Sequence, residues 1–162
     1  MISGMSDDRI EESRVIAADP ATIFSVLRDP QGHVTIDSSG MLMSASGSPA
    51  SAVDDEFVVH MDREALGDRP LGLYDVTVHI TAYEQDRAIE WSIQGVMNPP
   101  VGHVYGYRLE PVDGAEGGTR VTSYCDWTHL HPEYRGRIEF PIVPATALKA
   151  TLGILARTVQ RG

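Results

Sequence analysis

The sequence predicts a single α+β domain in which helices near the two ends of the chain enclose a run of antiparallel strands. Three observations predict it. Two Asp-Pro pairs near the N-terminus fit helix starts, the middle of the chain alternates apolar and polar residues, and the last segment returns to helical spacing. With 162 residues the chain can build one domain with a real core, but not two.

The first helix is predicted to begin at Asp19-Pro20. An aspartate in this position accepts a hydrogen bond from a backbone N–H of the first turn, and the proline that follows has no N–H to leave unpaired. An apolar face follows at helical spacing, formed by Ile23, Phe24 and Leu27. Pro30 ends the helix, because the residue before a proline avoids the α conformation.

A second, shorter helix is predicted from the repeated Asp29-Pro30, and it would place His33 and Asp37 four residues apart on one side. A carboxylate near an imidazole raises the imidazole pKa and can orient the ring as an acid or base. The competing interpretation is a solvated polar pair, because the neighbouring sequence offers no nucleophile or oxyanion hole.

From Met41 the apolar residues alternate with polar ones, which predicts half-buried antiparallel strands that form a meander. The segment "PVDGAEGGT" supplies a glycine-rich hairpin turn; it lacks the Lys-Ser/Thr of a phosphate loop. The residues expected on the buried face are Phe57, Val59, Met61, Tyr74, Val76, Val78, Ile80, Ile89, Trp91, Ile93, Tyr105, Tyr107, Leu109, Val121, Ser123, Cys125 and Trp127.

The C-terminal segment is predicted to be a long helix with Pro144 in its first turn. One apolar stripe follows at i, i+4, i+7 and i+11, formed by Leu148, Leu152, Leu155 and Val159. The stripe is expected to face the sheet.

Composition limits the partners and the compartment. The formal charge of −10 repels phosphate backbones, so no nucleic-acid partner is expected. Cys125 is the only cysteine, which excludes an internal disulfide and fits a reducing compartment. The sequence has no signal-peptide pattern and no apolar run long enough for a membrane span, so a cytoplasmic location is expected. Residues 1–12 are predicted to be loosely ordered, and residues 13–162 to form the domain.

The order of these elements, with "DPATIFSVLRDP", "RAIEW" and "YRLEPVDGAEGGTRVT", resembles the START-related helix-grip superfamily over roughly residues 13 to 161. The resemblance points to its polyketide cyclase/dehydrase and lipid-transport branch. It implies a curved antiparallel sheet of six to seven strands wrapped around the C-terminal helix, with two short helices after the first strand. It also implies a pocket for a hydrophobic ligand, and no cofactor.

Residues expected to line that pocket lie on the apolar sheet face and on the closing helix. They are Met61, Trp91, Tyr105, Tyr107, Ser123, Cys125, Trp127, Leu148 and Leu152. Tyr107 joins His33 and Asp37 as a candidate acid or base. The competing interpretation is an ordinary core, with Cys125 as a small buried filler. Arg108 and Arg120 alternate to the other face, so no arginine falls in the inward register of the clearly alternating strands, which weakens a cyclase assignment.

His129 and His131, with Glu133 close by, come nearest to a metal motif. A zinc site needs three or four converging ligands, and the sequence does not supply the rest, so no metal site is predicted. This segment is expected to be the end of the last strand and the loop into the closing helix.

Three functions remain open from the sequence. The leading hypothesis is a carrier or sensor that binds a small hydrophobic or aromatic molecule, polyketide-like or lipid-like, in an internal pocket. The second is a polyketide cyclase or dehydratase that works by general acid/base catalysis in the same pocket. The third is a protein-interaction module without a ligand. Either a monomer or a homodimer is compatible with the sequence.

Overall fold

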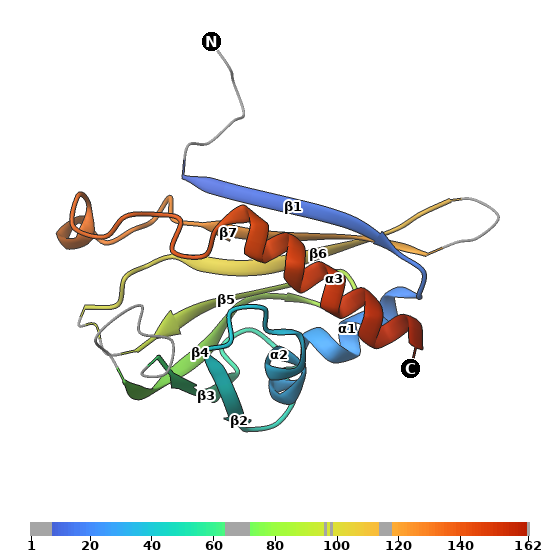
Figure 1. Cartoon of the computed structure of the whole chain (residues 1–162), viewed down its shortest axis with the longest axis horizontal. Coiled ribbons are helices and arrows are strands. Elements are labelled where there is room, and N and C mark those ends of the chain that lie inside the picture. The colour runs from blue at the N-terminus through green and yellow to red at the C-terminus, as the bar shows by residue number, and fades with distance from the viewer. Residues whose placement is uncertain (1–7, 64–71, 96, 98, 114–117, 162) are drawn as a thin grey trace, which may run out of the picture.

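The computed structural model describes residues 8–63, 72–95, 97, 99–113 and 118–161. Its elements are β1 (Arg9–Ile16), α1 (Pro20–Leu27), α2 (Pro30–Ile36), β2 (Leu42–Ser46), β3 (Glu56–Asp62), β4 (Leu73–Glu84), β5 (Ala88–Gln94), β6 (Val104–Pro111), β7 (Thr119–Asp126), the 3₁₀ turn η1 (Pro132–Tyr134) and α3 (Ala145–Arg161). The seven strands pair antiparallel in the order β1-β7-β6-β5-β4-β3-β2 (Figure 1). The predicted helix-grip fold is therefore confirmed.

The first strand begins earlier than predicted. β1 pairs with β7 along its whole length, from Arg9 opposite Asp126 to Ile16 opposite Thr119. The Arg9 Nη1 atom lies 3.0 Å from the Asp126 carboxylate, which fastens the start of the strand. β1 thus begins within the segment predicted to be loosely ordered, because charged residues on the outer face of a strand resemble a loose polar segment. Residues 1–7 of the predicted N-terminal segment lie outside the described residues.

Both predicted Asp-Pro helix starts are confirmed. The Asp19 carboxylate accepts a hydrogen bond from the Thr22 N–H at 2.8 Å, and Asp29 accepts one from the Gln31 N–H at 3.0 Å. Because α2 begins three residues after α1 ends, the chain turns back and the two helices touch. Gly32 makes this contact possible: a Cβ atom placed there would collide with the Val26 carbonyl group.

The closing helix α3 packs against β1 and β7, and the three helices cover the same face of the sheet (Figure 1). Leu148, Leu152 and Leu155 of the predicted stripe are buried. The helix itself begins at Ala145, and the Pro144 carbonyl accepts the first helical hydrogen bonds. The Ser38 hydroxyl forms a hydrogen bond with the Thr151 hydroxyl at 2.8 Å, which connects the segment after α2 to α3.

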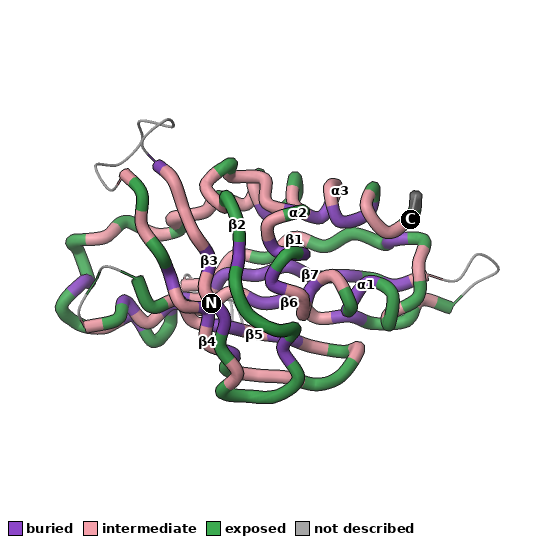
Figure 2. The backbone as a smooth tube through the Cα atoms, turned by 90° about the horizontal axis from the view of Figure 1, so that it is seen from below, coloured by how far each residue is buried: buried purple, intermediate pink, exposed green. Residues whose placement is uncertain are grey.

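The covered face of the sheet carries the core, to which strands β3 to β7 all contribute buried side chains, whereas β2 is mostly exposed (Figure 2). Strand pairing shifts register within β2 and within β4, and such bulges bend a sheet. β6 and β7 pair as predicted up to Pro111 opposite Thr119, while residues 114–117 of the glycine-rich turn lie outside the described residues.

The opposite face of the sheet is polar. The Tyr124 hydroxyl donates a hydrogen bond to Glu90, and the Arg9 and Arg108 guanidinium groups lie over the Tyr124 ring at 4.0 and 5.4 Å. Arg120 is exposed on the same face, so Arg108 and Arg120 point outward as predicted. In the part of the chain that the structure describes, no helix has the length and apolar character needed to cross a membrane.

Candidate functional site

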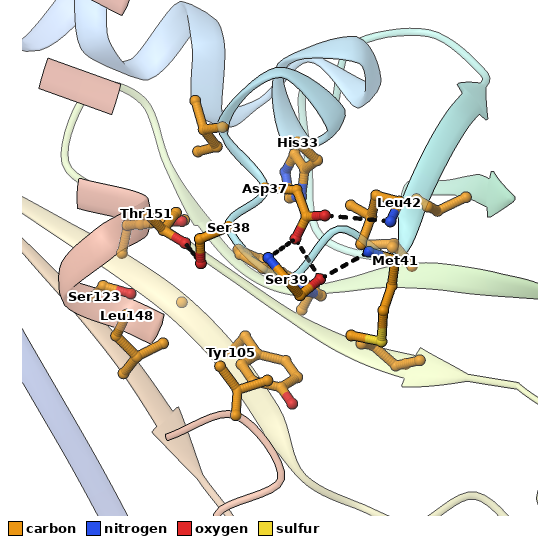
Figure 3. Close-up of a pocket in the computed structure, with 18 of the residues that line it drawn as sticks. His33, Asp37, Ser38, Ser39, Met41, Leu42, Tyr105, Ser123, Leu148 and Thr151 are labelled. Carbon is orange, nitrogen blue, oxygen red and sulfur yellow. Dashed lines mark hydrogen bonds between the residues drawn. The ribbon is translucent and has the colours of Figure 1, made fainter. Parts of the chain in front are cut away.

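Two adjoining chambers lie over the covered face of the sheet. The central chamber, about 150 Å³, lies between α2, α3 and the middle of the sheet (Figure 3). The distal chamber, about 320 Å³, lies toward the segments around residues 97–103 and 138–143. Six residues line both chambers: Met41, Met61, Val76, Ile93, Tyr105 and Val143. The chambers therefore share a wall and form one site.

The chamber volumes are large enough for organic molecules. A cavity needs only about 10–15 Å³ to hold a water molecule, and an apolar cavity of about 150 Å³ in another protein admits benzene. The distal chamber is about twice that size and lined mostly by apolar side chains, among them the methionines Met41, Met61 and Met97. The described interior is thus hollow where a fully packed core would hold side chains.

His33 is a buried wall residue of the central chamber. Its Nε2 atom lies 2.7 Å from the Leu27 carbonyl oxygen, and since a carbonyl only accepts, Nε2 carries the hydrogen. The ring packs edge-on against Phe57 and Trp91, with centroids 5.1 and 4.8 Å apart. Burial lowers the His33 pKa, so the ring is neutral at pH 7. These contacts are typical of a core histidine that holds α2 to the sheet.

Asp37 follows the end of α2 and organises the turn into β2. Its carboxylate accepts hydrogen bonds from the Ser39 N–H at 3.0 Å, the Ser39 hydroxyl at 2.6 Å and the Leu42 N–H at 3.2 Å (Figure 3). The Gly40 N–H donates a further hydrogen bond at 2.9 Å. Its own backbone is extended, with ψ at 126°. The i, i+4 rule for helices does not reach Asp37, and no hydrogen bond or ion pair joins it to His33. The predicted pair is not formed.

Replacing Asp37 with alanine is expected to lower the free energy of unfolding by about 2 kcal/mol, because several backbone and hydroxyl donors lose a charged acceptor. Urea denaturation measures this loss. Asp37→Asn keeps one acceptor oxygen, so its free energy of unfolding should lie between those of wild type and Asp37→Ala. Wild-type stability in Asp37→Ala combined with lost ligand binding would contradict the structural role and restore the catalytic one.

Six of the predicted pocket residues line the cavity: Met61, Trp91, Tyr105, Tyr107, Ser123 and Leu148. Burial raises the pKa of Tyr107, and burial together with the neighbouring Cys125 thiol raises the pKa of Tyr105. Both phenols stay protonated at neutral pH. They can donate a hydrogen bond to a ligand, but they cannot serve as bases there.

The other three predicted pocket residues lie outside the lining of both chambers. Cys125 and Trp127 belong to a second hydrophobic cluster that borders the distal chamber, and the Trp127 ring stacks on Phe140 at 5.4 Å. Burial raises the pKa of Cys125 to about 12, so its thiol is unreactive at neutral pH. Leu152 packs in the main core. Alternation finds the buried face of a strand, but not how far the cavity extends along it.

Three polar groups that line the distal chamber were not predicted from the sequence. They are the side chains of Arg63 and His103 and the hydroxyl group of Tyr74. Arg63 is only 6% exposed, and its Nε donates a hydrogen bond to the Tyr74 hydroxyl at 3.1 Å. The prediction about inward arginines concerned the strands, and Arg63 lies one residue beyond β3. Both Arg63 and His103 continue an alternation already recognised, two residues after Met61 and two before Tyr105, so that signal was present in the sequence.

The histidine-rich segment after β7 forms a turn. The His131 Nδ1 atom accepts a hydrogen bond from the Glu133 N–H at 3.1 Å and so caps η1. Across the described ranges, no group of three or more His, Cys, Asp or Glu side chains is arranged to hold a metal ion.

Comparison with known proteins gives a family and a set of folds. The model of the family described as polyketide cyclase/dehydrase and lipid transport matches residues 7–160. A curated relative, the uncharacterized protein Rv0088 of Mycobacterium tuberculosis, is 27% identical over 161 residues that cover 95% of this chain. This chain spans 65% of the length of that relative.

Two solved structures illustrate the likeness in fold. Protein CV1439 from Chromobacterium violaceum is 14% identical, with a TM-score of 0.64 over 96% of this chain and 99% of its own. The Aha1 dimer from Colwellia psychrerythraea is 18% identical, with a TM-score of 0.59 over 93% of this chain and 95% of its own. At such low identity the likeness concerns the fold alone.

Proposed function

The chain belongs to the polyketide cyclase/dehydrase and lipid transport family, and from that premise we propose that it carries or senses a small hydrophobic molecule, polyketide-like or lipid-like. The ligand would occupy the two-chamber cavity. Burial of apolar surface at roughly 25 cal/mol per Å² drives its binding, and a few polar groups in the walls fix its orientation.

The observation that carries this proposal is the pair of chambers over the covered face of the sheet. The chambers, of about 150 and 320 Å³, share six lining residues, and all of them except Tyr105 have fully apolar side chains or thioethers. Small-molecule sites have this character: a concave apolar surface with few polar groups. An interaction module without a ligand needs no such space, so the hollow argues against that alternative.

The cyclase or dehydratase alternative draws less support from the geometry. Its candidate acid and base, His33 and Asp37, are each occupied by hydrogen bonds that hold the fold. Tyr107 remains as a hydrogen-bond or proton donor beside Ser123. A donor alone binds a ligand carbonyl, whereas ring closure or dehydration also needs a group that removes a proton.

A neutral fluorescent probe tests the proposal. N-phenyl-1-naphthylamine is expected to bind one molecule per chain with a Kd on the order of 10 μM, with enhanced fluorescence that 1-decanol reverses. Native mass spectrometry counts the bound probe, and urea-unfolded protein is the control. Absence of a probe complex in the folded protein would contradict the proposal. Recovery of a host-cell ligand with an altered mass would instead favour the cyclase.

A further inference from the structure

The distal chamber is bordered by a histidine ring with an unused nitrogen. His103 lies one residue before β6, is 7% exposed and lines the chamber together with Tyr105, two residues later. Its Nδ1 atom is buried and has no hydrogen-bond partner among the described residues. Buried polar atoms in proteins normally have a partner, so this nitrogen points to a molecule that the chamber receives.

The backbone that carries His103 is held by close contacts. The His131 N–H donates a hydrogen bond to the Val101 carbonyl oxygen at 2.8 Å. Gly102 has a φ of 101°, and a Cβ atom there would come within 2.6 Å of the His129 carbonyl oxygen, so the two segments touch. The unpaired nitrogen therefore belongs to a residue on a fixed segment and not to one on a free loop.

The rings beside His103 do not supply the missing hydrogen bond. Tyr105 lies edge-on to it, with ring centroids 5.3 Å apart, and Phe140 lies 5.2 Å away and has no polar side-chain atom. The Tyr105 hydroxyl interacts with the Cys125 thiol, which contributes to the raised pKa of Tyr105. The chamber that the His103 ring borders has a volume of about 320 Å³, so it has room for a ligand that brings the partner.

The His103 ring is neutral, which limits the chemical group that can pair with it. Burial lowers the pKa of His103 to about 4, so at pH 7 one ring nitrogen holds a hydrogen and the other has a lone pair. A carboxylate or ketone oxygen only accepts a hydrogen bond, and an ammonium group only donates one. A hydroxyl group does both, so it can pair with Nδ1 in either tautomer of the ring.

We propose that the ligand is a hydrophobic alcohol or phenol whose hydroxyl group forms a hydrogen bond with the Nδ1 atom of His103 in the distal chamber. Its apolar body contacts the surrounding wall, which includes Met97, Ile138 and Ile142. This inference rests on the proposed function and names the ligand class of that site. A polar contact of this kind fixes which end of the ligand enters the distal chamber.

The pair 2-naphthol and 2-methylnaphthalene tests the proposal, because the two compounds share a ring system and differ in a hydroxyl against a methyl group. Equilibrium dialysis at pH 7, where 2-naphthol is neutral, measures the affinity of each. A purely apolar pocket disfavours an added hydroxyl by roughly hundredfold, whereas a pocket with a partner for the hydroxyl favours it. Wild type is therefore expected to bind 2-naphthol at least as tightly as 2-methylnaphthalene.

Three variants assign this preference to His103. His103→Leu removes the nitrogen and should weaken binding of 2-naphthol relative to 2-methylnaphthalene by about tenfold or more. His103→Asn keeps a polar atom near the position of Nδ1 and should retain much of the wild-type ratio. His60→Leu removes a histidine from β3 that bonds to Asp75 on the outer face at 2.7 Å, and should leave the ratio unchanged. A wild-type ratio in His103→Leu would mean that the hydroxyl binds elsewhere and that the proposal is wrong.

The outcomes separate this inference from the proposed function. If N-phenyl-1-naphthylamine binds but wild type binds 2-naphthol more weakly than 2-methylnaphthalene, the hydroxyl inference is wrong and the proposed function stands. If none of the three compounds binds, the proposed function is wrong and the inference falls with it. The wild-type comparison needs no variant, so it decides the ligand class even if His103→Leu fails to fold.

Discussion

Replacing Gly32 with alanine is expected to lower the free energy of unfolding by about 3 kcal/mol. The added methyl group would collide with the Val26 carbonyl oxygen and come within 2.8 Å of the carbonyl carbon, and both atoms belong to the backbone of α1. Alanine favours a helix over glycine by about 1 kcal/mol, but a clash with backbone cannot be relieved by a rotamer change. The two helices must separate, so the clash outweighs the gain.

A matched glycine shows whether the contact or the residue type matters. Gly153 lies in α3, where an added methyl group would meet only the end of the Arg14 side chain at 3.6 Å. Gly153→Ala is therefore expected to be neutral or to stabilise by up to about 1 kcal/mol. Urea denaturation measures both variants. A Gly32→Ala protein within about 1 kcal/mol of wild type would mean that α1 and α2 are not in close contact.

Replacing Ile93 with tryptophan is expected to weaken binding of N-phenyl-1-naphthylamine by about hundredfold or more. Ile93 lines both chambers, so an indole at this position fills the space where they join. Overpacking a dense core costs about 1–3 kcal/mol, but this side chain enters a hollow. The free energy of unfolding should stay within about 1 kcal/mol of wild type.

The neighbouring residue provides the control for this variant. Ser92 precedes Ile93 on β5, and successive side chains of a strand point to opposite faces. Ser92→Trp therefore adds the same indole outside the cavity and should bind the probe as wild type does. Equal binding by Ile93→Trp and wild type would place the probe elsewhere and contradict the proposed site.

The fold was predictable because its signals are local. Asp19 and Asp29 cap their helices whatever lies around them, and the alternation through β3 to β7 gives the buried face of each strand. The start of β1 was not predicted, because the charged residues Arg9 and Glu11 are explained only by their tertiary contacts. They pair with each other and, across the sheet, with Asp126 and Arg108.

The site was predictable in part. Alternation along a strand predicts which side chains face the interior, but the extent of the cavity depends on how side chains from the whole chain pack. Met61 and Tyr105 line the cavity, whereas Cys125 and Trp127 lie on the same face of the sheet but outside the lining of both chambers. Arg63 and His103 were missed because polar residues at strand ends resemble loop residues. His33 and Asp37 were paired by helical spacing, but the helix ends at Ile36, before the second of them.

The three methionines of the distal chamber have a consequence for selectivity. Unbranched thioether side chains change rotamer at little energetic cost, so a wall that contains Met41, Met61 and Met97 reshapes itself around what enters. Such a cavity discriminates poorly between ligands that have similar volumes but different shapes. We expect affinity to vary little across homologous ligand chains, straight or branched.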